Sequence, residues 1–329
     1  MSSERNATSD PFFSVVVPCR NFNGYLRQSL AEILKQNDEN FEIIVLPDQP
    51  NAETFPKTTV IPAALGPAQK RNLALKSARG EVLAFIDDDA YPNADWLKRA
   101  RPHFQDPEIA AVCGPGLTPP TDSLWQKASG WVSASLLGGG PFSFRFFPGL
   151  KREVDDFPSM NFLVRRRDFE AVQGFDSDFW PGEDTKLCLD LTRKLGKKII
   201  YDPAIRVYHH RRPLFEPHLK QVGEYGRHRG YFARVLPQTS RRLSYFLPSL
   251  FVTFLLIFPI VAGFLPAGWW LYRSVVSLYL LLLMLTSIWV WSKEKNAEIA
   301  LLVVPGILAT HLWYGLKFLQ GFFSPRLER

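Results

Sequence analysis

The chain has 329 residues, of which 46% are hydrophobic and 22% are charged, and its net charge is +7. This composition is typical of a folded protein and excludes a disordered or collagen-like chain. The last 87 residues carry six Lys/Arg and three Asp/Glu, whereas the first 242 carry 33 and 29. Neither part is basic enough to predict nucleic-acid binding. The composition instead predicts a soluble N-terminal part and a membrane-embedded C-terminal part.

The N-terminal part alternates between short apolar runs and segments of helical periodicity. Continuous apolar strands separated by helices are typical of a parallel sheet covered on both faces. We therefore expect an α/β domain of the doubly wound, Rossmann-like kind. Helices are expected around 26–34, from Pro67 and over 184–195, and the Gly-, Phe- and Pro-rich stretch 138–150 is expected to be a mobile loop. The expected strands are 13–17, 41–46, 59–61, 82–86, 161–165, 199–201 and 205–209.

Three apolar segments follow Arg242. Residues 243–272 carry no charge, with a turn expected at 266–268, and 274–292 form a second uncharged stretch. The third, 299–316, is interrupted by Pro305-Gly306 and His311. Since a span needs about 20 apolar residues, two or three membrane helices are expected.

The chain ahead of these segments predicts how the protein lies at the membrane. Residues 213–242 are expected to form an interfacial amphipathic segment with a basic cluster. The segment Lys293-Glu294-Lys295 is basic on balance, which favours a multi-pass protein of the cell membrane with its N-terminal domain in the cytoplasm. The polar tail 1–12 lacks the apolar region of a signal peptide, and the three cysteines lack metal or disulfide spacing, which fits that compartment. The cluster consists of Arg227, Arg229, Arg234, Arg241 and Arg242.

Polar residues follow the expected strands at the ends where open α/β sheets bind ligands. The most informative are Asp87, Asp88 and Asp89, directly after the strand at 82–86. Three adjacent carboxylates repel one another unless a cation neutralises them. Oxygen ligands of this kind predict Mg²⁺ or Mn²⁺, which proteins commonly share with phosphates. The sequence contains neither GxxxxGK[ST] nor GxGxxG after the first strand, which argues against a P-loop NTPase and a dinucleotide oxidoreductase.

The order and spacing of the motifs over 13–212 resemble the inverting glycosyltransferases of family 2, which have the GT-A fold. The motifs are the opening strand with Pro18-Cys19-Arg20-Asn21, Lys70-Arg71-Asn72, Asp87-Asp88-Asp89, Gly182-Glu183-Asp184 and His209. The usual Asp-Asp-Gly-Ser motif is replaced by Pro47-Asp48-Gln49-Pro50. The resemblance implies a membrane-anchored, hexosyltransferase-type enzyme that uses a nucleotide-sugar donor. It also implies a GT-A nucleotide-sugar domain at 13–212, followed by the interfacial segment 213–242 and a helical membrane domain at 243–329.

The resemblance assigns a role to each candidate residue. Asp184 is expected to be the catalytic base, with Glu183 as its rival. Asp89 and His209 are expected to hold the metal, and Trp180 and Glu183 are expected to contact the acceptor. The residues expected to bind the donor nucleotide are Pro18, Arg20, Asn21, Asp48, Lys70, Arg71, Asp87 and Asp88.

A catalytic base favours an acceptor hydroxyl, because a polyprenyl phosphate is already ionised and needs no base. The membrane segments favour a lipid-linked or membrane-associated glycan as that acceptor, with membrane lipids as partners. Three alternatives stay open: a polyprenyl-phosphate glycosyltransferase, a processive synthase and a non-catalytic membrane scaffold. The processive synthase is disfavoured because its Gln-x-x-Arg-Trp motif is missing around Gln221-Val222-Gly223-Glu224-Tyr225.

Overall fold

The computed structural model describes residues 10–179, 181–265 and 267–327. Contacts between Cα atoms divide the chain into two compact units. The sheet unit consists of Met1–Gly116 and Leu150–His209, and the helical unit consists of Leu117–Gly149 and His210–Arg329. Residues 117–149 and 210–212, which we expected in the N-terminal domain, therefore lie in the helical unit.

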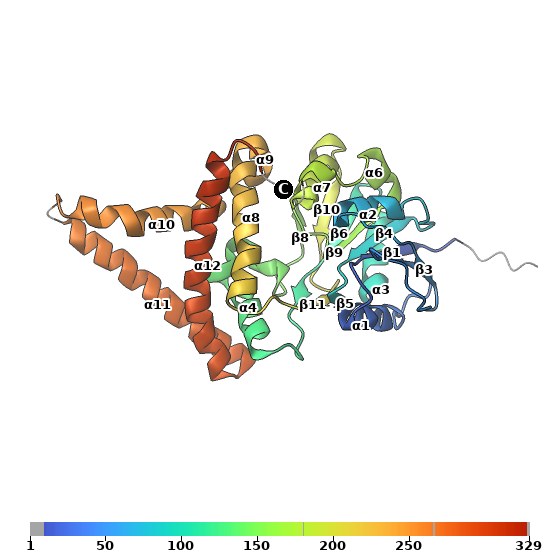
Figure 1. The fold of residues 1–329 in the computed structure, drawn as a ribbon, viewed down its shortest axis with the longest axis horizontal. Coiled ribbons are helices and arrows are strands. Elements are labelled where there is room, and N and C mark those ends of the chain that lie inside the picture. Colours follow the sequence, from blue (N-terminus) through green and yellow to red (C-terminus); the bar gives the residue numbers. More distant parts are fainter. Residues whose placement is uncertain (1–9, 180, 266, 328–329) are drawn as a thin grey trace, which may run out of the picture. The chain divides into compact units, whose positions relative to one another are not determined.

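An eight-stranded sheet forms the centre of the sheet unit, in the strand order β3-β2-β1-β4-β9-β6-β10-β8 (Figure 1). The strands predicted at 41–46, 82–86 and 161–165 are confirmed with these bounds. The eight strands are β1 (Phe13–Pro18), β2 (Phe41–Leu46), β3 (Thr58–Val60), β4 (Val82–Ile86), β6 (Ile109–Cys113), β8 (Arg152–Val154), β9 (Asn161–Arg165) and β10 (Lys198–Tyr201).

The sheet is mixed, so the prediction of a parallel sheet is wrong for β9, while β8 was not predicted as a strand. β9 is antiparallel to both β4 and β6, and β8 is antiparallel to β10. Every residue of β9 is buried, as in a central parallel strand, so its apolar composition gives no sign of its direction. The α/β class itself is confirmed.

The described residues of this unit include the α-helices α1 (Gly24–Ile33), α2 (Pro67–Ala74), α3 (Trp96–Ala100), α6 (Arg166–Ala171) and α7 (Glu183–Leu189), which continues as a π-helical turn, Asp190–Lys194. α1 begins where the side chain of Asn23 accepts the N–H of Leu26, as N-cap residues do. Its buried Leu26, Leu30 and Ile33 recur at helical spacing and join the core beneath β1 and β2. A second, three-stranded sheet has the order β5 (Ala90–Pro92), β11 (Val207–His209) and β7 (Gly116–Leu117).

The helical unit contains α4 (Leu124–Ala134), α5 (Leu136–Gly139), α8 (Glu216–Val235), α9 (Pro237–Ser240), α10 (Leu243–Ala262), α11 (Gly268–Glu294) and α12 (Ala297–Phe323). The stretch 138–150, expected to be a mobile loop, forms the end of α5 and the 3₁₀ helix Gly140–Arg145. Hydrogen bonds hold the start of the stretch in place: the N–H of Gly138 donates to the hydroxyl of Ser135 at 3.1 Å, and the N–H of Gly139 donates to its carbonyl oxygen at 2.8 Å.

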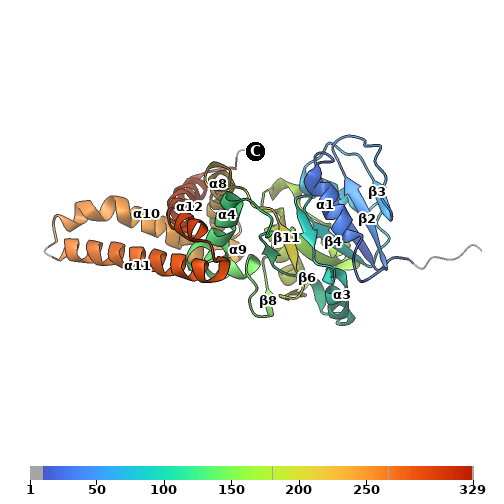
Figure 2. The ribbon, with the colours of Figure 1, turned by 90° about the horizontal axis from the view of Figure 1, so that it is seen from below.

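α12 packs more extensively against α8 than any other two elements of the described chain pack together, and Figures 1 and 2 both show these two helices side by side. The contacts rely on glycine. A Cβ atom on Gly230 of α8 would lie 2.0 Å from the carbonyl oxygen of Phe318, and one on Gly321 of α12 would lie 1.8 Å from that of Arg227. The two backbones therefore approach too closely to admit a methyl group at either position.

The described residues include three helices long and apolar enough to cross a membrane: α10, α11 and α12, with mean hydropathies of 2.2, 2.0 and 1.8 in their most apolar windows. Their bounds differ from the predicted segments. α11 begins at Gly268 and continues through Arg273, and α12 continues through Pro305 without a break. Of the predicted turn at 266–268, residue 266 lies outside the described residues.

Candidate active site

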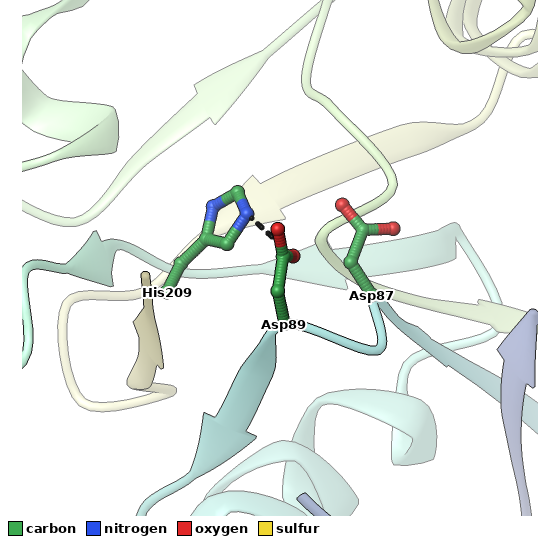
Figure 3. A group of neighbouring side chains, drawn as sticks. All are labelled: Asp87, Asp89 and His209. Carbon is green, nitrogen blue, oxygen red and sulfur yellow. Dashed lines mark hydrogen bonds and ion pairs between the residues drawn. The ribbon is translucent and has the colours of Figure 1, made fainter. Parts of the chain in front are cut away.

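Three predicted residues meet at the carboxyl end of β4. Asp87, Asp89 and His209 each offer one ligand atom, and these atoms lie within 4.8 Å of one another (Figure 3). His209 Nε2 is 3.0 Å from Asp89 Oδ1, and all three side chains are half-buried. Two carboxylates and an imidazole are ligands that divalent cations accept, so the residues fit the predicted metal.

The backbone explains why His209 meets residues so distant in sequence. β11 pairs antiparallel with β5, and the register places His209 opposite Ala90, the residue after Asp89. The rings of Tyr91 and Tyr208 stack in the same pairing, with their centroids 5.1 Å apart. The two-stranded pairing therefore fixes the imidazole beside the carboxylates.

α2 connects the other predicted motifs to one another. Lys70 is buried, and its ammonium group pairs with Asp48 and donates to the carbonyl oxygen of Cys19 at 2.5 Å. Asn72 exchanges two hydrogen bonds with the backbone of Phe175, at 2.7 and 2.8 Å. Both side chains therefore tie neighbouring segments together at this edge of the sheet.

Arg71, between them, lies among three carboxyl groups. Its Nη2 is 2.7 Å from Asp87 Oδ1, its Nη1 is 3.5 Å from Glu183 Oε1, and Asp184 is close enough to interact electrostatically. The side chain is only 5% exposed, so water screens these interactions little. Arg71 therefore joins the end of β4 to the start of α7.

Glu183 and Asp184 are adjacent but face different surroundings. Glu183 is buried, with one oxygen towards Arg71 and the other accepting the N–H of Gly182 at 3.0 Å. Asp184 accepts from the hydroxyl and the N–H of Ser159, while its Oδ1 is buried without a hydrogen-bond partner in the described chain. Burial raises the pKa of both carboxyl groups above their ordinary values, more than the attraction of Arg71 lowers it.

The remaining predicted donor residues lie at the same edge of the sheet. Pro18 ends β1 and is buried, whereas Arg20 and Asn21 after it are exposed. The carbonyl oxygen of Arg20 accepts the N–H of Asp48 at 3.0 Å, which ties the ends of β1 and β2 together. Asp88 is half-buried and close enough to Cys19 to interact electrostatically.

Sequence reasoning missed Ser159, the hydrogen-bond partner of Asp184. The residue precedes β9, and because β9 is antiparallel its first residue, Asn161, pairs with Ile86, directly before Asp87. The surrounding Pro158-Ser159-Met160 has no motif that would have revealed it. Trp180, expected at the acceptor, lies outside the described residues.

Comparison with known families gives one match to this region. Residues 14–173 match the model described as Glycosyl transferase family 2. These residues include every motif at the ends of β1, β2 and β4, but not Asp184 or His209.

Curated relatives and a solved structure are similar to longer parts of the chain. A pre-mycofactocin glycosyltransferase of Mycobacterium tuberculosis is 27% identical over 218 residues, 65% of this chain and 46% of that protein. The chain thus matches about half the length of that relative. A dolichyl N-acetyl-α-D-glucosaminyl phosphate 3-β-D-2,3-diacetamido-2,3-dideoxy-β-D-glucuronosyltransferase of Methanococcus voltae is 24% identical over 247 residues, 68% of this chain and 74% of that protein.

The structural likeness extends over both units. The mannosyltransferase PcManGT of Pyrobaculum calidifontis, solved with GDP-Man and Mn²⁺, has a TM-score of 0.57 and 18% sequence identity. The superposition covers 97% of this chain and 89% of that one, so the likeness in fold includes the C-terminal helices.

Proposed function

Because residues 14–173 match the model described as Glycosyl transferase family 2, we propose that the chain is a glycosyltransferase that is inverting and depends on a divalent metal. In this proposal it transfers a sugar from a nucleotide-sugar donor to a hydroxyl group of a lipid-linked or membrane-associated glycan. One observation carries the proposal: Arg71 joins Asp87 of the metal cluster to Glu183, the neighbour of Asp184. The groups needed at the two ends of an inverting transfer thus belong to one connected cluster.

Asp184 is the proposed base. An acceptor hydroxyl must lose its proton as it attacks the anomeric carbon, and a carboxylate within hydrogen-bond reach contributes about 10²- to 10⁴-fold to such a step. Oδ1 of Asp184 has no partner among the described residues, and Ser159 holds the other side of the carboxyl group. Burial raises its pKa, which makes it a stronger base than an exposed aspartate. Both oxygens of its rival, Glu183, face Arg71 and Gly182.

The proposed donor site lies beside the metal cluster. Asp87, Asp89 and His209 would hold the cation, and the imidazole nitrogen favours Mn²⁺ over Mg²⁺, which prefers oxygen ligands. The bound cation would stabilise the negative charge on the departing nucleoside diphosphate. Pro18, Arg20, Asn21 and Asp88 line the approach, while Lys70 positions Asp48 for the nucleotide base.

The acceptor and the location are also part of the proposal. The relative from Methanococcus voltae is named for a dolichyl phosphate-linked sugar, which supports a lipid-linked acceptor. Apolar helices in the same chain would keep the enzyme at the bilayer where such acceptors lie. The basic residues at 293 and 295 favour the cytoplasmic side for the sheet unit. A polyprenyl phosphate remains the alternative acceptor, because it would need no base.

The test is a panel of nucleotide sugars with Mn²⁺ or Mg²⁺, with release of nucleoside diphosphate measured with and without a membrane lipid extract. We expect release that requires both a divalent cation and the extract. Asp89→Ala should lose Mn²⁺-dependent nucleotide binding in calorimetry, and unchanged binding would refute the metal site. Full transfer by both Asp184→Asn and Glu183→Gln would refute the hydroxyl acceptor and support the polyprenyl phosphate.

A further inference from the structure

The three apolar helices of the helical unit do not have the same surroundings. In the most apolar 18-residue window of α12, 39% is buried within the structure. The buried share of the corresponding window is 22% in α10 and 11% in α11. α12 also carries His311, Lys317 and Gln320, whereas α10 has no charged residue and α11 has none between Arg273 and Lys293. Length and composition alone therefore do not show that all three cross a membrane.

The helix beside α12 is strongly polar. α8 and α12 run parallel: His218 hydrogen-bonds Thr310 at 2.9 Å, and further along Gly230 lies against Phe318. The exposed face of α8 carries charges from its first turn to its last, at Glu216, Lys220, Glu224 and Arg234. A charge at the bilayer centre is costly, so α8 cannot lie along the hydrocarbon core. Since α12 lies beside α8 from Thr310 to Phe322, this half of α12 cannot cross that core either.

α10 and α11 differ from this pair. α10 approaches α12 near its own start, where Gly315 lies against Pro248 and Val252. Beyond that point the two helices extend away from α8 and α12, as Figures 1 and 2 both show. Their apolar side chains are widely exposed there: Leu256 is 66% exposed and Ile260 is 67% exposed. Leu283 and Val290 of α11 are buried against α12, but most of the apolar side chains of the hairpin are not buried by other described residues.

Aromatic and charged residues mark two ends on α11. Trp269, Trp270 and Arg273 lie at its start, and Trp289, Trp291 and Lys293 at its end. Tryptophan gathers at both interfaces of a bilayer. Trp289 follows Trp270 by 19 positions, a rise of about 29 Å at about 1.5 Å per residue, which is close to the hydrocarbon thickness of about 30 Å. A hairpin that stopped halfway would also leave Arg273 and non-helical backbone in hydrocarbon.

We infer that the chain crosses the membrane twice, through α10 and α11, and that α12 lies in the plane of the membrane beside α8. The outer face of α12 then contacts the membrane lipids, at the boundary between their headgroups and their acyl chains. Leu301, Trp313, Leu316 and Phe323 form an exposed stripe on α12, as interfacial helices do. Both ends of α12 and the sheet unit then lie on one side of the membrane, and only the end of the hairpin between α10 and α11 reaches the other. This inference does not depend on the proposed reaction.

Cysteine labelling of the full chain in right-side-out and inside-out vesicles tests this topology. The reporters are Lys98→Cys in the sheet unit, Leu265→Cys in the hairpin connection, and Glu298→Cys and Arg326→Cys at the two ends of α12. The probe is a membrane-impermeant maleimide. The unsubstituted chain gives the background, since Cys19, Cys113 and Cys188 are buried.

We expect Lys98→Cys, Glu298→Cys and Arg326→Cys to label from one side and Leu265→Cys from the other. Labelling of Arg326→Cys from the side of Leu265→Cys would show that α12 crosses and would overturn the inference. Two results for Leu265→Cys would show that α10 and α11 do not cross the membrane. One is labelling from the same side as Lys98→Cys, and the other is labelling from neither side until detergent is added.

A matched pair of lysine substitutions gives an independent measurement. Leu281 of α11 and Leu316 of α12 are equally exposed, at 45% and 44%. Leu281→Lys places a charge near the bilayer centre, so the amount of folded protein in the membrane should fall about tenfold or more. Leu316→Lys should change that amount by less than about twofold, because a lysine at the interface reaches water. Equal losses for the two variants would contradict an interfacial α12.

Discussion

The sheet unit carries 23 Lys/Arg against 26 Asp/Glu, whereas the helical unit carries 16 against six. The net charge of +7 is thus the sum of −3 and +10. The sheet unit buries charges and pairs them, as Arg71 and Lys70 show. The helical unit leaves most of its charges at the surface and brings α8 and α12 together through glycines. Buried charges can shift the pKa values of neighbouring groups in a site. Close packing of helix backbones does not depend on the hydrophobic effect, so it suits a unit that lies beside lipid.

The largest expected effect concerns the buried carboxyl groups of the sheet unit. Asp184→Asn keeps the shape of the side chain but removes the proposed base, so sugar transfer should fall about 10²- to 10⁴-fold. Donor binding, measured by calorimetry with Mn²⁺, should change little. Glu183→Gln is the matched control, and a larger loss of transfer in that variant would exchange the roles of the two residues.

Arg71→Met tests whether the buried ion pairs of Arg71 stabilise the folded sheet unit. The variant leaves Asp87 and Glu183 without their cation, and we expect a loss of about 3 kcal/mol in the free energy of unfolding. Arg27 forms the matched exposed pair, since both arginines lie 2.7 Å from a carboxylate oxygen and Arg27 is 48% exposed. Arg27→Met should lower the free energy of unfolding much less, because water screens an exposed ion pair. Chemical unfolding of both variants measures the two changes in the free energy of unfolding. Equal losses would show that burial of the Arg71 ion pair does not increase its contribution to stability.

Gly321→Ala tests the packing of the helical unit. The added methyl group would meet the carbonyl oxygen of Arg227, and such overpacking costs about 1–3 kcal/mol. Gly263→Ala is the control, because its nearest atom would be 3.4 Å away. Thermal unfolding in detergent should show a lower Tm for Gly321→Ala and an unchanged Tm for Gly263→Ala. An unchanged Tm for Gly321→Ala would mean that the helices separate at little cost.

The smallest effect is a pH dependence of stability in the sheet unit. Burial raises the pKa of Glu183, so the folded state binds its proton more tightly than the unfolded state. The stability this gives is full below the ordinary value of about 4.5 and is lost as the pH rises towards neutrality. With EDTA present, the Tm should therefore fall less between pH 5 and pH 8 in Glu183→Gln than in the unsubstituted chain. Identical slopes would refute the shift.

The local pattern of the sequence was enough to predict β2, β4 and β9, because continuous apolar runs bounded by polar residues are readable without any partner. The pattern could not show that β9 runs in the opposite direction, because direction depends on the neighbouring strands. It also could not assign 117–149 to the helical unit, since that depends on contacts such as the 2.9 Å hydrogen bond from Trp131 to Glu294.

The candidate site shows the same limit. Asp87, Asp89 and His209 were predicted and lie together, because strand ends in an open sheet converge. The partners of Lys70 and Arg71 were not predicted, although both residues were selected as candidates. Each pairs with a carboxylate that follows another strand, at a distance in sequence that no local motif encodes.

The reversed direction of β9 changes where useful residues should be sought. Parallel strands deliver the residues that follow them to the reactive edge of a sheet, but an antiparallel strand delivers those that precede it. Ser159 reaches Asp184 in this way, and Asp156, a little earlier, accepts from Thr185 one residue beyond. In this chain, a mutational survey of the proposed acceptor side should begin with 155–160, upstream of the strand.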